Sequence, residues 1–169
     1  MNELGIIDFF IVSKDRHVLT STRKTNGFSR FILKVDDVST FADANDYFPF
    51  NIWLPAHVIH KSLVESLQTK TLTVFTEVHT IEERENALLS GVNGIITSDP
   101  LTLIKRYESF KSLTHIREVS FVAHRGLHLG YQDSIGPENS LESALKAKAH
   151  GAKIIEIDIH LSVDNEVMV

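Results

Sequence analysis

The chain has 169 residues, fewer than the roughly 250 that an eight-stranded α/β barrel typically needs. Its apolar fraction of 43% is typical of globular proteins, its net charge of −5 gives no reason to expect nucleic acid, and its lack of cysteine excludes disulfides and thiolate chemistry. No apolar run approaches the roughly 20 residues that span a bilayer, and the apolar stretch 5–12 lacks the basic flank of a signal peptide. We therefore expect a cytoplasmic chain, although a membrane segment could lie elsewhere in a longer protein.

The first third of the chain predicts strands separated by polar loops. Leu4–Val12 predicts a strand, a hairpin or bend follows at 13–16, and His17–Thr22 predicts a second strand. Arg30–Val35 predicts a third. Asp36 and Asp37 follow it, and they either begin a short helix, where acids are favourable, or contribute to a metal site.

The middle third alternates strand and helix patterns. Thr80 with Glu83 forms a capping-box pattern at the start of a helix that Gly91 ends. The other predicted elements are a helix from Pro55 to Gln68, strands at Thr71–His79 and Val92–Thr97, and a helix from Pro100 to Phe110. This alternation is typical of a parallel sheet.

The last third carries polar chemistry at the ends of two apolar runs. The run from Val119 to Ala123 is followed by His124 and Arg125, and the run 153–160 contains Glu156 and Asp158 two positions apart. Side chains alternate along a strand, so the two carboxylates are expected on one side. A cation and a carboxylate pair at the end of parallel strands suit a metal-assisted reaction on an anionic substrate.

Between these runs lies Pro137-Glu138-Asn139 and then a helical pattern from Ser140 to His150. Asn139 is the predicted N-cap, and Gly151 is the predicted stop. His128 and His150 belong to no motif, and we expect both at the surface.

Residues 121–169 resemble the opening of a glycerophosphodiester phosphodiesterase domain. The motifs that carry the resemblance are HRG at 124–126, PEN at 137–139, and, after a helix, GAKIIEID at 151–158. The family pattern continues through a hairpin that closes on His-Asp, and this chain stops shortly before that second histidine. The family's third acidic metal ligand has no assignable match either.

Residues 70–100, KTLTVFTEVHTIEERENALLSGVNGIITSDP, are similar to the end of the same type of domain. Glu77 stands near the asparagine of the family's W-T-V-N strand, a departure that suggests a degenerate domain. The predicted parts are an N-terminal segment, 1–110, with late βα units; a linker, 111–118; and a truncated C-terminal segment, 119–169, with the first βαβ unit. Alternatively, the late units could close around the early ones as a permuted barrel with one core. Both alternatives give an α/β fold, an incomplete (β/α) barrel of the phosphodiesterase type.

The resemblance implies a role for each polar residue of the C-terminal segment. His124 would be the catalytic acid and base, Arg125 a catalytic residue that also binds substrate phosphate, and Glu138 a second substrate-binding residue. Glu156 and Asp158 would bind a divalent metal, Ca²⁺ or Mg²⁺. Without the resemblance, His124 could simply bond to backbone, Arg125 could form a surface ion pair, and Glu138 could complement the helix N-terminus.

The implied function is metal-dependent hydrolysis of glycerophosphodiesters to an alcohol and glycerol 3-phosphate, incomplete in this chain. The metal would polarise the phosphoryl oxygens. The alternative is a non-catalytic, degenerate barrel that binds a phosphate ligand or a partner. A related lyase acting on phosphatidylinositol or sphingolipid headgroups fits less well, because PEN is present. The expected partner is a small-molecule glycerophosphodiester, and self-association or downstream sequence could complete the barrel.

Overall fold

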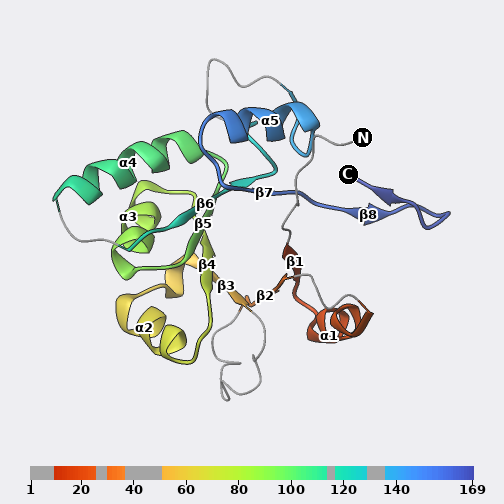
Figure 1. Ribbon diagram of the computed structural model, residues 1–169, viewed down its shortest axis with the longest axis horizontal. Helices are drawn as coiled ribbons and strands as arrows, with labels where there is room; N and C mark the ends of the chain where they lie inside the picture. The colour runs from red at the N-terminus through yellow and green to blue at the C-terminus, as the bar shows by residue number, and fades with distance from the viewer. Residues whose placement is uncertain (1–9, 26–29, 37–50, 114–116, 129–135) are drawn as a thin grey trace.

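The computed structural model describes residues 10–25, 30–36, 51–113, 117–128 and 136–169. In this part of the chain, seven parallel strands form a curled half-barrel with helices on its outer side (Figure 1). The strands follow one another in chain order from β1 to β7, and a two-stranded antiparallel hairpin, β8–β9, follows β7. The predicted α/β class and incomplete barrel are therefore confirmed. No helix within the described ranges is long and apolar enough to cross a membrane.

The elements run in a regular alternation along the chain. The strands are β1 (Phe10–Ser13), β2 (Arg30–Lys34), β3 (Asn51–Pro55), β4 (Val74–Glu77), β5 (Gly94–Thr97), β6 (Ser120–His124), β7 (Ile154–Glu156), β8 (His160–Leu161) and β9 (Val167–Met168). The helices are α1 (Arg16–Thr25), α2 (Lys61–Thr69), α3 (Ile81–Ser90), α4 (Pro100–Leu113) and α5 (Leu141–Ala149), with a 3₁₀ turn at Ala56–Val58.

The predicted strand at His17–Thr22 is wrong, because these residues form most of α1. β1 and β2 pair in parallel, and parallel neighbours need a crossover rather than a hairpin. Asp15 begins the helix by accepting a hydrogen bond from the His17 backbone N–H at 2.7 Å. The helix then buries Leu19 completely.

The later predictions are largely confirmed, with shifted boundaries. Thr80 and Glu83 form the predicted capping box, and Gly91 ends α3 in a left-handed conformation at φ 76°. The predicted helix from Pro55 begins later, because Pro55 belongs to β3 and His60 is the N-cap of α2. Asp36 lies 2.7 Å from the Lys14 ammonium, whereas Asp37 and the predicted helix after it lie outside the described residues.

One sheet joins the two predicted segments. β5 of the N-terminal segment pairs in parallel with β6 of the C-terminal segment, with Ile96 opposite Val122. Tyr107 of α4 packs edge-on against Phe121 of β6, with ring centroids 5.2 Å apart. α4 also extends to Leu113, so the predicted linker begins within a helix. The division into three parts stays a prediction, and the shared sheet is what the permuted alternative requires.

The strands are apolar on both faces, as in a sheet covered on each side. The outer face and the helices share a large cluster that includes Leu33, Leu54, Val74, Ile95 and Phe121. A second cluster takes one residue from each of five strands; its members are Ile32, Trp53, Phe75, Ile96 and Val122, with Phe10 and Ile154 packed against them. This second row forms the inner face of the half-barrel.

Candidate functional site

The inner face places polar side chains at its carboxyl end. In β4, β6 and β7, the inner apolar residue is followed two positions later by Glu77, His124 and Glu156, respectively. Because side chains alternate along a strand, these three residues stand directly above the inner apolar row. Active sites of α/β barrels lie at this end of the strands.

His124 lies between two carboxylates. Its Nε2 atom is 3.4 Å from Oε1 of Glu77 and 3.9 Å from Oε2 of Glu156. The three side chains are mostly covered, with 22%, 18% and 17% of their surfaces exposed for His124, Glu77 and Glu156. The site therefore draws on both predicted segments.

Arg125 contacts the three predicted acidic residues of the site. Its backbone N–H donates to the Glu156 carbonyl at 2.9 Å and to the Glu156 carboxylate at 3.2 Å. Its Nη1 donates to both Glu138 oxygens, at 3.1 and 3.2 Å, and its Nε lies 2.8 Å from Asp158. All five predicted residues are thus in one cluster, and Glu156 and Asp158 face the same arginine.

The backbone around Arg125 is held in an unusual conformation. Arg125 and Asn139 both have positive φ, 56° and 57°, which non-glycine residues adopt at a cost of roughly 1–2 kcal/mol. The Asn139 N–H donates to the Arg125 carbonyl, and the Asn139 side chain accepts from the Asp158 N–H, each at 3.0 Å. Asn139 therefore links the Arg125 backbone to the backbone of Asp158, whose carboxylate pairs with the guanidinium.

This bridging role corrects the predicted N-cap. Ser140, not Asn139, caps α5 by accepting from the Ser143 N–H at 3.1 Å. Ser143 in turn donates its hydroxyl to the Arg125 carbonyl at 3.2 Å. Gly126 must be glycine here, since its φ is +83° and an added Cβ would lie 2.7 Å from the backbone of Ser143. The helix start and the site loop are thus one packed unit.

Electrostatics at the site follow from burial and close charges. Burial raises the pKa of the Glu156 carboxyl above its ordinary value; the neighbouring Asp158 raises it further, while His124 and Arg125 oppose the rise. The hydrogen bond that Arg125 donates to Glu138 and the charge of Asp158 raise the pKa of Arg125, which therefore stays protonated.

Glu156 and Asp158 fit a hard divalent cation by their donor chemistry. Both offer carboxylate oxygens. The charge of a cation would offset the repulsion from Asp158 and the cost of burying the Glu156 carboxylate, the two effects that raise the Glu156 pKa. Among the described residues, no group of three or more His, Asp or Glu side chains is arranged to hold a metal. Two protein carboxylates with water and substrate oxygens are, however, a common Mg²⁺ environment.

Sequence reasoning missed two features of the site. Glu77, interpreted as a sign of degeneracy, lies against His124, and it also lies 3.7 Å from Lys34 and 3.8 Å from His79. His128, expected at the surface, has only 9% of its side chain exposed and lies 3.6 Å from Glu138. Glu77 could have been found from its strand position, two residues beyond an inner apolar residue. His128 gave no such signal.

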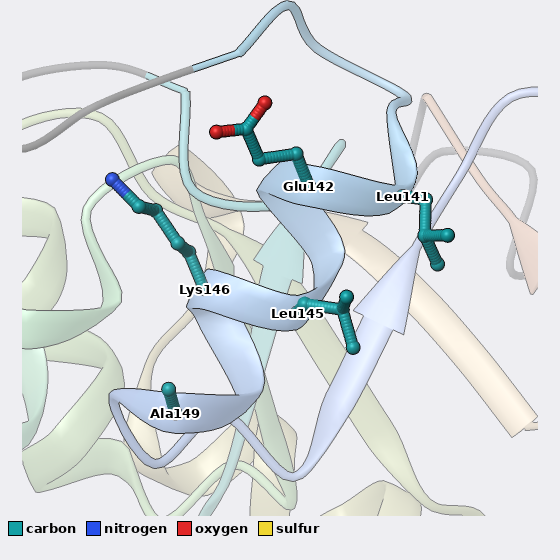
Figure 2. Close-up of a pocket in the computed structure, with 5 residues that line it drawn as sticks. All are labelled: Leu141, Glu142, Leu145, Lys146 and Ala149. Atoms are coloured by element: carbon teal, nitrogen blue, oxygen red, sulfur yellow. The ribbon is translucent and has the colours of Figure 1, made fainter.

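Two other histidines of the C-terminal segment lie away from the cluster. His150 is the exposed C-cap of α5, as expected for a surface residue, and His160 is exposed in β8. Two leucines of α5 face outward: Leu141 is 76% and Leu145 57% exposed. Figure 2 shows both leucines on one side of the helix, lining a shallow depression with Glu142, Lys146 and Ala149.

The fold and the site describe an incomplete (β/α) barrel with ionisable residues gathered at the carboxyl ends of its strands. Residues 124–169 match the sequence model of the glycerophosphoryl diester phosphodiesterase family. This match confirms the resemblance of the C-terminal segment and covers His124, Arg125, Glu138, Glu156 and Asp158. A search of curated proteins found no match.

Proposed function

We propose that the chain supplies a site for metal-dependent hydrolysis of glycerophosphodiesters to an alcohol and glycerol 3-phosphate. The observation that carries the proposal is the convergence of His124, Arg125 and the carboxylate pair at the carboxyl end of parallel strands, within the segment that matches the phosphodiesterase family. The substrate is a small molecule, and its phosphate is the group the site recognises.

His124 and Arg125 have different roles in the proposed reaction. The Arg125 guanidinium binds the non-bridging phosphate oxygens, after exchanging its contact with Glu138 or Asp158 for the substrate. His124 accepts a proton from the attacking water as the water oxygen bonds to phosphorus, and it returns that proton to the leaving alcohol oxygen as the P–O bond breaks. Glu156 and Asp158 would hold Ca²⁺ or Mg²⁺, whose charge stabilises the phosphoryl oxygens when it is bound. Glu138 keeps Arg125 aligned until phosphate arrives.

The experiment compares release of glycerol 3-phosphate from glycerophosphocholine by the wild-type chain and by His124→Ala, with Mg²⁺ or Ca²⁺ present. Loss of an acid–base imidazole is expected to lower the rate by at least about 100-fold. His150→Ala is the matched control, because His150 is an exposed helix cap. Equal rates for wild type and His124→Ala would contradict the proposal.

A second candidate function has an observation of its own. Glu77 stands near the asparagine position of the family's pattern, a departure that suits a degenerate module whose Arg125 binds a phosphate ligand without turnover. Such a module would bind glycerol 3-phosphate, measured by calorimetry, and Arg125→Ala would abolish the binding. Self-association or downstream strands are proposed as the completing partner, because β7 forms an edge of the described sheet.

A further inference from the structure

We propose that Glu77 is a positioning residue for His124, so that the N-terminal segment completes the site of the C-terminal segment. The inference rests on the proposed function for its kinetic consequence and on the structure alone for its geometry. Glu77 ends β4, and His124 ends β6. Neither the family match, which begins at residue 124, nor the motif pattern assigns Glu77 any role.

The contact between the two side chains is not a by-product of neighbouring strands. β4 and β6 are separated by β5, so their backbones lie about 10 Å apart. The 3.4 Å separation of Glu77 Oε1 and His124 Nε2 therefore requires both side chains to lean across the end of β5. The inward curl of the sheet brings them together.

Glu77 is itself held in place. Its Oε2 atom lies 3.7 Å from the Lys34 ammonium, which sits 3.9 Å above the centre of the Trp53 ring. Trp53 is almost completely buried in the inner cluster. A partly buried carboxylate needs such a partner, because an unpaired charge is costly there. The chain of contacts from Trp53 to Lys34 to Glu77 thus fixes the acid that faces His124.

The consequence for His124 concerns which ring nitrogen carries the proton. Glu77 and Glu156 both approach Nε2, and a carboxylate favours an N–H that points at it. Nε2 then holds the hydrogen, and Nδ1 is left as the nitrogen that can accept a proton from the attacking water. A carboxylate that orients an imidazole in this way acts on the rate rather than on substrate binding.

The test uses Glu77→Ala and Glu77→Gln in the whole chain, with Glu65→Gln as the matched control on an exposed face of α2. The first readout is the ¹⁵N spectrum of the His124 ring in the neutral state, assigned by its absence in His124→Ala. We expect Nε2–H in wild type and in Glu65→Gln, and a mixture of tautomers in Glu77→Ala. The amide oxygen of Glu77→Gln can still accept, so this variant is expected to retain Nε2–H.

The second readout is turnover of glycerophosphocholine. Glu77→Ala is expected to lower kcat about 10- to 100-fold with little change in KM, as for other residues that orient a functional group, and Glu77→Gln is expected to recover most of the rate. The inference would be overturned if Glu77→Ala kept the wild-type His124 tautomer. It would also be overturned if the wild-type chain is active and Glu77→Ala has the same kcat. A wild-type chain without turnover overturns the proposed function alone, and the ring spectrum then decides the role of Glu77.

Discussion

Single residues at this site are defined by strand alternation and by backbone conformation. Alternation sets Glu77, His124 and Glu156 above the inner apolar row, where they meet at the carboxyl edge. Arg125 would project elsewhere if its backbone were not left-handed, and Gly126 makes the next turn possible by lying directly against α5. The geometry of the site therefore depends on residues that carry no charge.

Gly126→Ala is expected to destabilise the fold more than Gly91→Ala does. Both glycines have positive φ, so both variants lose about 1 kcal/mol to backbone strain. Only at Gly126 would the new methyl group overlap a neighbour, the backbone of Ser143, which adds about 1–3 kcal/mol. Urea unfolding of the two variants measures the difference, and equal losses would show that the loop yields to the methyl group.

At the scale of elements, local capping decides where the helices begin. α3 begins with a reciprocal pair: the Thr80 hydroxyl accepts from the Glu83 N–H, and the Glu83 carboxylate accepts from Thr80 N–H. A hydrogen bond from the His79 N–H, partly offset by burial, lowers the pKa of Glu83. The ionised Glu83 carboxylate therefore contributes fully to the stability of the fold at neutral pH, and this contribution is lost as the pH falls through the lowered pKa.

Thr80→Ala is expected to reduce the free energy of unfolding by about 1 kcal/mol, the usual effect of losing an N-cap. Ser66→Ala, at an exposed position inside α2, is the control and is expected to change stability by less than about 0.5 kcal/mol. Chemical denaturation followed by circular dichroism measures both. Similar values for the two variants would argue against the capping box as a source of stability.

Sequence patterns predicted elements with strong local signals and missed those that depend on tertiary context. The Thr80 capping box can be predicted from the sequence, and so can the His124–Arg125 pair at the end of an apolar run, because each pattern spans only a few neighbouring residues. The pattern predicts a strand where α1 forms, because Val18 and Leu19 are the only apolar residues of α1 and its many β-branched residues are typical of strands. The contact between Glu77 and His124 joins positions far apart in the chain and depends on the curl of the sheet.

At the scale of the whole molecule, the two predicted segments form one sheet, and β6 of the C-terminal segment contributes to the outer core of the N-terminal segment, whereas α5 packs on a separate small cluster. Phe121 of β6 belongs to the same buried cluster as Leu33 of β2 and Leu54 of β3. The parallel pairing of β5 with β6 is the kind of pairing that joins neighbouring strands of a barrel. We therefore expect the segments to unfold together rather than as independent domains.

Phe121→Ala tests this expectation through Trp53, the single tryptophan of the chain, which lies in β3. Removing a buried aromatic ring is expected to cost about 3–5 kcal/mol. The unfolding midpoint reported by Trp53 fluorescence should fall together with the midpoint reported by circular dichroism. Leu141→Ala, at an exposed site on α5, is the control. A Trp53 midpoint that does not move would mean that the segments are separate domains.

Turnover of a glycerophosphodiester by the folded chain, with and without a divalent cation, is the decisive test of the proposed function. Phosphorus NMR follows glycerophosphocholine and glycerol 3-phosphate in the same sample. We expect conversion with Mg²⁺ or Ca²⁺ that stops when EDTA is added and resumes when the cation is restored. A folded chain that binds the cation and leaves the diester intact would contradict it, and conversion that EDTA does not affect would contradict the role given to Glu156 and Asp158.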